Sequence, residues 1–390
     1  MNIALISPYH GGSHRAWAEG FQQASRHNVV IFSLPARFWK WRMHGGAVTL
    51  ARQYLAHPTQ FNLILATDML DLTTFLALTR EKTAVSTLYL HENQLTYPLP
   101  ADKESGPMRR QHGERDLHYV FINYASMLAA DHLFFNSHFH QQSLLTALPK
   151  FLRRFPDHSE VETVEAIWGK SEVLPVGVDL KRLEIGDWRL GEDRQSPISN
   201  LQPPLILWNQ RWEFDKNPEA FLAVLYQLAD EGIPFRVALC GEHFGKRPFL
   251  HPQITQKLGS RLIHLGYADN DLYRQLLWQA DITLSTAHHE FFGISIIEAI
   301  YTHTFPLLPR RLSYPELIPE PFHRHCLYKK QPELLKKLRW ALANPAALKP
   351  ITQELATAVS HYDWQQVSPL YDEKMVTLWQ TYQAETRENQ

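Results

Sequence analysis

The sequence predicts an α/β fold of two doubly wound domains, each with a parallel sheet covered by helices. Short apolar runs alternate with helical patterns along most of the chain, which is typical of strands paired in parallel through helical crossovers. The runs are continuously apolar, as expected of strands buried on both faces. The alternation stops within residues 186–204 and then starts again, and 390 residues are enough for two domains.

The first domain is expected over residues 1–185. Its first strand is followed by a turn with two glycines and by a helix at Ser13–Ser25. The predicted strands are Asn2–Ser7, Val29–Ser33, Leu63–Ala66, Val85–Leu90, His132–Phe135 and Glu172–Val176. Ligands of such sheets bind at the carboxyl ends of the strands, so polar residues that follow a strand are the first site candidates.

Residues 186–204 are rich in Pro, Gly, Asp, Arg, Ser and Asn, which indicates a linker. The second domain is expected over residues 205–360, with a helix at Glu219–Glu231. Its predicted strands are Leu205–Trp208, Phe235–Leu239, Leu262–Leu265, Ile282–Ser285 and Phe305–Leu308. A last helix at Asp363–Gln380 carries an apolar stripe, and residues 361–390 are expected to pack back towards the first domain.

The composition is that of a globular protein without a dominant charge, with 44% hydrophobic residues, 20% charged residues and a formal net charge of −1. Any nucleic-acid contact must therefore come from local patches. Two cysteines exclude a disulfide framework and favour a reducing compartment. No apolar stretch approaches the ~18 residues of a membrane span, and the N-terminal run is too short for a signal peptide, so we expect a cytoplasmic protein.

The strongest motif follows the strand Ile282–Ser285. It comprises Glu290-Phe291-Phe292-Gly293 and, on the next helix, Ile294, Ser295 and Glu298. The first N–H groups of a helix are unpaired, and a glycine there lets a diphosphate approach closely. Glu298 lies roughly 7–8 Å further along the helix, where its carboxylate can accept the hydroxyls of a ribose. The motif predicts a sugar-nucleotide site, and the alternative is a capped helix with two solvated glutamates.

Two cations, Arg211 and Lys216, follow the strand Leu205–Trp208. Fixed cations at the end of a strand can stabilise the charge that develops on a leaving diphosphate. The alternative is a surface turn with an ordinary ion pair. Gly241 and Tyr267 follow two further strands and complete the residues expected to bind the donor.

Two polar clusters follow strands of the first domain. Gly11-Gly12-Ser13-His14 contains tandem glycines that let the backbone pass close to a ligand, although a plain tight turn would have the same sequence. His91-Glu92-Asn93-Gln94 follows the strand Val85–Leu90, and four polar residues at a strand end favour a functional role. We expect Gly12 to contact the donor, His91 to be catalytic, and the acceptor to contact His14, Glu92, Asn93 and Gln94.

Basic and aromatic residues interleave in Arg37-Phe38-Trp39-Lys40-Trp41-Arg42. Such a segment can hold phosphates with its cations and stack bases on its indoles. A membrane interface or a place in the core are the alternatives. We expect Trp39, Lys40, Trp41 and Arg42 to contact the acceptor. Other cations of this domain are more often part of a solvated face, namely Arg109, Arg110, Arg115, Lys150, Arg153 and Arg154.

Two motifs that suggest a metal have simpler interpretations. Asp269-Asn270-Asp271 looks like the D-x-D of metal-dependent glycosyltransferases, but Asp269 is expected to cap a helix at Leu272–Gln279. His288 and His289 are adjacent and cannot converge on one ion without help. We therefore expect no metal site.

The Glu290-to-Glu298 spacing resembles the E-x7-E motif of retaining glycosyltransferases with the GT-B fold, especially family 4. Arg211 and Lys216 resemble that family's phosphate-binding pair, and residues 174–179 are similar to its segment before the domain crossover. This resemblance implies two Rossmann-like domains that face a central cleft.

Motifs along nearly the whole chain are similar to those of the tRNA-queuosine alpha-mannosyltransferases. They are Gly11-Gly12-Ser13-His14, Leu34-Pro35-Ala36 with Trp39-Lys40-Trp41-Arg42, His91-Glu92-Asn93-Gln94-Leu95 with Tyr97-Pro98, Phe135-Asn136-Ser137, Arg211-Trp212-Glu213 with Asp215-Lys216 and Pro218-Glu219, His289-Glu290-Phe291-Phe292-Gly293, and Tyr314-Pro315-Glu316. Two positions depart from the family pattern. Asn209-Gln210 stand where Pro-His is expected, and His303 stands where a glycine is expected in a left-handed conformation.

The resemblance implies retaining transfer of mannose from GDP-mannose to the cyclopentenediol of queuosine in a tRNA anticodon (tRNA-Asp type), without a metal or cofactor. It also implies that Glu298 holds the ribose, that Glu290 orients the sugar, and that the turn at Gly266-Tyr267 contacts the guanine. Three alternatives stay open: a hexosyltransferase for a lipid or glycan acceptor, a non-catalytic RNA-binding protein on the same fold, and a GT-B phosphorylase or epimerase, which would need different acceptor chemistry and no RNA.

Overall fold

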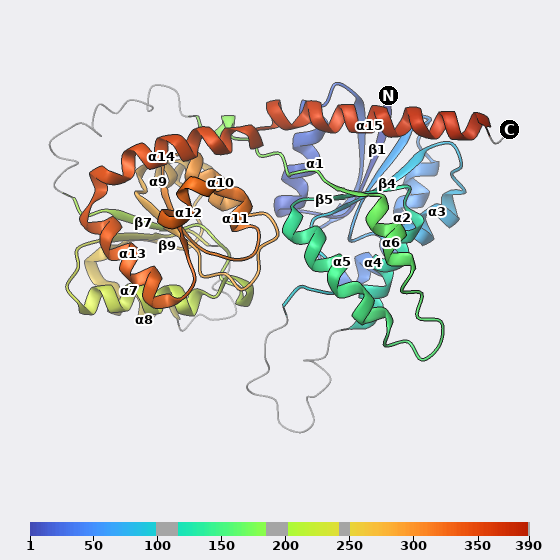
Figure 1. Ribbon diagram of the computed structural model, residues 1–390. Coiled ribbons are helices and arrows are strands. Elements are labelled where there is room, and N and C mark those ends of the chain that lie inside the picture. The colour runs from blue at the N-terminus through green and yellow to red at the C-terminus, as the bar shows by residue number, and fades with distance from the viewer. Residues whose placement is uncertain (99–115, 185–201, 242–249, 389–390) are drawn as a thin grey trace. The chain divides into compact units, whose positions relative to one another are not determined.

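The computed structural model describes residues 1–98, 116–184, 202–241 and 250–388. Most of the expected linker, together with Arg109, Arg110 and Arg115, lies outside the described residues. The chain divides into two compact units, Met1–Val178 with Tyr362–Gln390 and Asp179–His361 (Figure 1). Each unit holds a six-stranded parallel sheet with helices on both faces (Figure 1). The predicted α/β class with two doubly wound domains is confirmed.

The sheet of the first unit has the strand order β2-β1-β3-β4-β5-β6, so the order reverses between β1 and β3. The strands are β1 Asn2–His10, β2 Asn28–Pro35, β3 Leu63–Thr67, β4 Val85–Leu90, β5 His132–Phe135 and β6 Ser171–Val173. The helices between them are α1 Gly12–Ala24, α2 Trp39–Leu55, α3 Leu72–Thr79, α4 Leu117–Ala129, α5 His138–Leu152 and α6 Thr163–Gly169. Strands β3 and β4 are buried at every position, which explains their continuous apolar or small residues.

The C-terminal helix α15, Trp364–Glu388, belongs to the first unit, as predicted. Backbone hydrogen bonds join Val178 to this end of the chain, since its N–H donates to Tyr362 O and its O accepts from Trp364 N. The Trp364 ring needs two glycines, because a Cβ would lie 2.0 Å from it at Gly20 and 2.3 Å at Gly177. The helix therefore completes the core of the first unit.

The sheet of the second unit has the order β12-β11-β10-β7-β8-β9, with the reversal between β7 and β10. The strands are β7 Leu205–Trp208, β8 Arg236–Leu239, β9 Leu262–Leu265, β10 Ile282–Leu284, β11 Phe305–Pro309 and β12 Leu327–Tyr328. The helices are α7 Pro218–Asp230, α8 Leu250–Leu258, α9 Asn270–Gln279, α10 Ile294–Tyr301, α11 Tyr314–Leu317, α12 His323–Cys326, α13 Gln331–Ala343 and α14 Pro345–Val359. No described helix is both long enough and apolar enough to cross a membrane.

Candidate functional site

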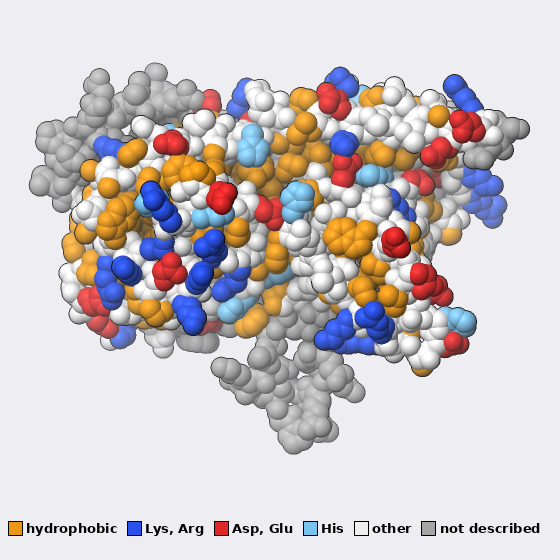
Figure 2. All heavy atoms as spheres, in the orientation of Figure 1, with side chains coloured by type: hydrophobic (Ala, Val, Ile, Leu, Met, Phe, Trp, Pro, Cys, Tyr) orange, Lys and Arg blue, Asp and Glu red, His pale blue; other side chains and the backbone are white. Residues whose placement is uncertain are grey.

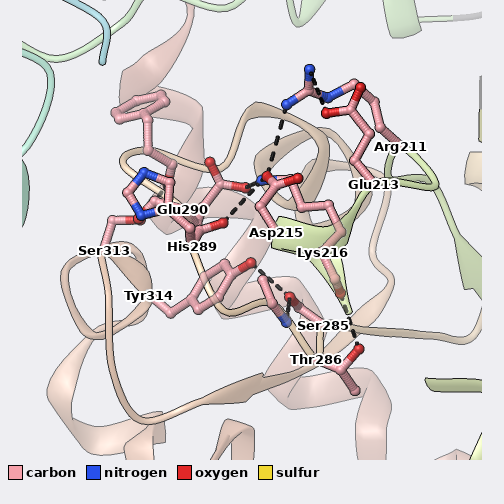
Figure 3. Close-up of polar contacts among 12 residues, drawn as sticks. Arg211, Glu213, Asp215, Lys216, Ser285, Thr286, His289, Glu290, Ser313 and Tyr314 are labelled. Atoms are coloured by element: carbon pink, nitrogen blue, oxygen red, sulfur yellow. Dashed lines mark hydrogen bonds and ion pairs between the residues drawn. The ribbon is translucent and has the colours of Figure 1, made fainter. Parts of the chain in front are cut away.

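The two strongest motifs meet at the point where the strand order of the second unit reverses. The loop after β7 carries Arg211 and Lys216, and the loop after β10 carries Glu290 (Figure 3). Backbone hydrogen bonds join the loops, because the N–H groups of His288 and His289 donate to Asp215 O at 2.7 and 3.1 Å. Reversal points of open parallel sheets are the usual ligand sites of such folds.

Lys216 is buried and ionised at the centre of this site. Its Nζ lies 3.0 Å from Glu290 Oε2, 3.2 Å from Asp215 Oδ2 and 3.1 Å from His289 O (Figure 3). Burial lowers the pKa of Lys216, but the carboxylates of Glu290 and Asp215 more than offset this and raise it above its ordinary value. Only 8% of the residue is exposed, which a solvated surface turn does not explain.

Arg211 adds a second, more accessible cation. Its guanidinium is half-exposed and lies 3.3 Å from Glu213 and 3.8 Å from Asp215 (Figure 3). Asp215 thus lies between the two predicted cations. Because an exposed arginine presents several N–H donors in a fixed fork, it can bind a phosphate without displacing the buried pair.

The start of α10 has the geometry that the glycine predicts. Gly293 is the N-cap residue with φ 108, a left-handed value that a side chain rarely adopts. The N–H groups of Ile296 and Ile297 donate to Gly293 O, which leaves those of Ile294 and Ser295 without an acceptor in the helix. The helix start can therefore receive an anion.

Glu298 is 4% exposed, so it is not a solvated carboxylate. Its Oε2 accepts a hydrogen bond of 2.7 Å from Tyr273 OH, and its Oε1 forms an ion pair with Arg182. Burial and the charge of Glu298 hold the pKa of Tyr273 well above its ordinary value, so the hydroxyl stays protonated and can donate. The sequence did not point to Tyr273 or Arg182, because only the fold brings them to Glu298.

The departure at Asn209 takes part in the same network. Its Nδ2 donates to Ser295 O at 2.7 Å and to Tyr273 OH at 3.2 Å. Within the described residues, Asn209 Oδ1 and both side-chain amide atoms of the neighbouring Gln210 are buried without a hydrogen bond. The carboxyl end of β7 thus presents amide groups that can bind a ligand.

The remaining donor candidates differ in their surroundings. Phe291 is buried, with its ring 4.1 Å from that of His289. A Cβ at Gly241 would lie 2.3 Å from the Trp212 ring, so packing alone requires this glycine. Tyr267 is 67% exposed, and no hydrogen bond or ring contact joins it to the rest of the described chain.

For one of the two motifs that suggest a metal, the structure shows the predicted simpler role. Asp269 caps α9, with Oδ1 accepting from Leu272 N at 2.9 Å, so that expectation is confirmed. Over the described ranges, no group of three or more His, Cys, Asp or Glu side chains could hold a metal ion.

In the first unit, His91 lies in an aromatic cluster at the end of β4. Its ring is 4.5 Å from His14, 4.6 Å from Trp17 and 4.7 Å from Tyr89, measured between centroids. Burial holds the pKa of His91 well below its ordinary value, with further lowering by His14 and His140, so the ring is neutral. His91 Nε2 is buried and has no hydrogen-bond partner among the described residues.

The polar residues that follow His91 form hydrogen bonds within their own turn. Asn93 is buried and holds its own turn, since its Oδ1 accepts from Leu95 N and Thr96 N. Gln94 Nε2 donates to Glu92 Oε1 at 3.2 Å. A buried carboxylate that the sequence did not suggest, Asp68, accepts from His91 N at 2.9 Å. Burial and Glu92 raise its pKa well above the ordinary range.

The aromatic and basic segment surrounds the start of α2. Trp41 is 63% exposed and Trp39 is half-exposed, so Trp41 is not a core residue. Lys40 Nζ lies 5.7 Å from the Trp39 ring centroid and 5.6 Å from that of Tyr119. Arg42 Nε donates to Pro35 O at 3.2 Å. Gly12 is the first residue of α1, with a left-handed φ of 53.

Two family models match the chain. Residues 2–178 match the tRNA-queuosine alpha-mannosyltransferase N-terminal family, and residues 191–356 match glycosyl transferases group 1. The tRNA-queuosine alpha-mannosyltransferase of Drosophila melanogaster is 34% identical over 339 residues, which cover 86% of each chain.

Solved structures support the fold. Sucrose-phosphate synthase from Thermosynechococcus elongatus has a TM-score of 0.73 at 16% identity and covers 98% of this chain and 100% of its own. HepE from Anabaena, in complex with UDP, has a TM-score of 0.68 at 16% identity, with coverage of 97% and 100%. At these identities the likeness extends to the fold alone, and it confirms the GT-B architecture.

Proposed function

Because this chain belongs to the tRNA-queuosine alpha-mannosyltransferase family and is a glycosyltransferase, we propose that it transfers mannose from GDP-mannose to queuosine in a tRNA of the tRNA-Asp type. One observation carries the donor half of the proposal: the ion pair of buried Lys216 with partly buried Glu290 lies in the loops that meet where the sheet order of the second unit reverses. A tRNA acceptor and two free cysteines favour the cytoplasm.

The diphosphate binds at the start of α10. The N–H groups of Ile294 and Ser295 donate to its oxygens, and Gly293 supplies the left-handed conformation from which the helix begins. The ribose hydroxyls bind Glu298, whose Oε2 stays fixed by Tyr273. Arg182 is half-exposed, so it can leave Oε1 when the ribose arrives. The guanine lies beside Gly241 and Tyr267.

Arg211 and Lys216 stabilise the leaving diphosphate in place of a metal ion. Lys216 is already held by two carboxylates, so little reorganisation is needed as negative charge develops on the departing phosphate. Glu290 gives one oxygen to Lys216 and keeps the other for a sugar hydroxyl. No cofactor takes part in the proposed reaction.

The transfer proceeds with retention. The acceptor hydroxyl oxygen forms a bond to C1 of mannose on the face from which the phosphate departs, while the bond between C1 and the phosphate oxygen breaks. The departing phosphate takes the hydroxyl proton, and no protein nucleophile is required. The products are mannosyl-queuosine in tRNA and GDP.

The first unit provides the acceptor side. We assign queuosine to the polar residues around neutral His91, namely His14, Glu92, Asn93 and Gln94, and the tRNA strand to Trp39, Lys40, Trp41 and Arg42. The exposed indole of Trp41 can stack on a base, and the cations can pair with phosphates.

Mass spectrometry of tRNA nucleosides tests the proposal. The purified chain is incubated with GDP-mannose, GDP-fucose, UDP-glucose or UDP-galactose and with tRNA that contains or lacks queuosine. A hexose added to queuosine only with GDP-mannose, and equally in the presence of EDTA, is the expected result. Transfer to queuosine from another nucleotide sugar would contradict the proposed donor, and no hexose on queuosine-containing tRNA, or an equal amount on tRNA that lacks queuosine, would contradict the proposed acceptor.

A further inference from the structure

The second unit carries a basic surface that the donor site does not use. Residues 310–337 contain seven Lys and Arg against three Glu, a formal charge of +4 in a chain whose total is −1. Five of these cations define the basic surface: Arg310, Arg324, Lys329, Lys330 and Lys336, all exposed. Figure 2 shows Lys and Arg side chains gathered on this unit over α12 and α13.

Strand pairing brings the cations together. Strands β11 and β12 are parallel, with Pro309 opposite Tyr328, so Arg310 and Lys329 leave the same edge of the sheet side by side. The N–H of Arg310 donates to Tyr328 O at 2.7 Å. Lys337 of α13 binds Arg324 O, which joins α12 to the same surface. Carboxyl ends of strands in one parallel sheet share an edge, so Arg310 and Lys329 lie at the edge that carries the donor site.

The cations are not explained by ion pairing or helix stability. Within the described part of the chain, the side chains of Arg310, Lys329, Lys330 and Lys336 form no salt bridge, whereas the nearby Arg339 pairs with Glu231. Lys329 and Lys330 immediately precede α13, and Lys330 is its N-cap residue. Cations are unfavourable at the positive end of a helix dipole. Their clustering therefore costs stability and indicates an anionic partner.

One contact links the basic surface to the donor loop. The Arg311 guanidinium donates to Ala287 O at 2.9 Å, three residues before Glu290. Burial, Arg324 and Lys337 hold the pKa of His325 below its ordinary value, consistent with a positive local potential.

We propose that the basic surface binds backbone phosphates of the tRNA acceptor. This inference rests on the proposed function, and it adds a second-unit contact to the acceptor residues of the first unit. An RNA fits better than a membrane, because no large hydrophobic side chain of residues 310–337 is exposed and α13 exposes a single one, Trp340, whereas a membrane surface site needs several apolar anchors. Phosphate contacts fix the register of a nucleic acid without reading its sequence.

Equilibrium binding of queuosine-containing tRNA, measured by filter retention without donor between about 50 and 200 mM salt, tests the proposal. Each lost phosphate contact should reduce the magnitude of the negative slope of log K against log salt by about 0.7–0.9, so Lys329→Ala/Lys330→Ala should reduce it by roughly 1.4–1.8. Donor affinity by calorimetry should not change. The matched control, Lys257→Ala/Lys349→Ala, removes the same charge from exposed positions of the same unit outside residues 310–337 and should leave the slope unaltered.

The outcomes separate this proposal from the proposed function. An unchanged slope and affinity in Lys329→Ala/Lys330→Ala, or an effect equal to that of the control, would overturn the basic surface while mannosyl transfer continues. If Lys329→Ala/Lys330→Ala lost binding to phosphatidylserine vesicles but kept its affinity for tRNA, the basic surface would be a membrane site and the tRNA proposal would be wrong. Wild-type chain that binds tRNA but transfers no hexose would contradict the proposed function alone. Thermal melting checks that the variant folds. Its melting temperature should not fall, because the substitution removes cations from a helix N-terminus.

Discussion

Glu298 is held by two partners that differ in exposure. Tyr273 is half-buried and fixes Oε2, whereas Arg182 on Oε1 is more exposed. Glu298 could be predicted from its spacing to Glu290, since both lie in one short stretch of sequence. Its partners could not, because they lie 25 and 116 residues away and no local pattern marks them. Likewise, Lys216 could be predicted as a cation of the site. Its burial between two carboxylates could not be predicted from the sequence.

Replacement of Tyr273 by Phe tests whether this hydroxyl positions the carboxylate. A hydrogen bond to a charged group contributes about 1.5–3 kcal/mol, so the variant should bind GDP-mannose roughly 10- to 100-fold more weakly. Because Tyr273 does not contact the reacting atoms, the donor KM should rise more than kcat falls. Calorimetric titration and steady-state kinetics measure both.

Tyr226→Phe provides the control for this measurement. Tyr226 lies in the same unit, and its hydroxyl has no hydrogen bond within the described residues. Equal donor affinity in the two variants, or an unaltered donor KM in Tyr273→Phe, would contradict the positioning role.

At the scale of elements, strands were more predictable than the connections between them. Mainly apolar runs predicted β4, β5, β7 and β9 at their observed bounds, but β9 is only partly buried, because it is an edge strand of its sheet. The pattern gave no sign of β12, because its two residues, Leu327 and Tyr328, form a strand only through their register with β11. The loop-to-helix change at Gly293 was visible because only the glycine suits its left-handed conformation. His303 has φ 63 after α10, which confirms that a non-glycine residue occupies a left-handed position there.

Replacement of Gly293 by Ala should impair both the helix start and donor binding. A left-handed conformation costs an alanine about 1–2 kcal/mol, and the new Cβ would lie 3.1 Å from Leu317 Cδ1. Movement of the backbone would also displace the N–H groups of Ile294 and Ser295. We expect a donor Kd at least about 10-fold higher, which corresponds to about 1.4 kcal/mol.

Gly232→Ala separates strain from function. Gly232 has φ 70 and open space around it, so an alanine there costs similar backbone strain far from the two donor loops in sequence. Thermal melting should show comparable destabilisation in both variants, whereas only Gly293→Ala should lose affinity for GDP-mannose. Parallel losses of affinity would show that Gly293 acts through stability alone.

At the scale of the whole molecule, the first unit is assembled from both ends of the chain. Trp17 Nε1 donates to Tyr371 OH at 3.0 Å across 354 residues of sequence. Asp372 accepts hydrogen bonds from Ser25 Oγ at 2.5 Å and from Arg26 N at 2.9 Å. Helix α15 therefore accepts hydrogen bonds from the turn after α1 and also covers the apolar face of α1. A buried carboxylate with such partners leaves them unsatisfied when it is removed.

Residues 1–178 alone should therefore not form a stable folded unit. A protein in which a short Gly-Ser linker joins Val178 to Tyr362, so that α15 is present, should fold stably. The two ends lie together, since Val178 N donates to Tyr362 O at 2.8 Å, and a linker of a few residues can span them. Circular dichroism should show one cooperative thermal transition for the linked protein and none for residues 1–178. Trp364→Ala in the linked protein should remove about 3–5 kcal/mol, because the indole fills the space that Gly20 and Gly177 leave. If residues 1–178 melted cooperatively at the same temperature as the linked protein, α15 would be a surface addition and not part of the core.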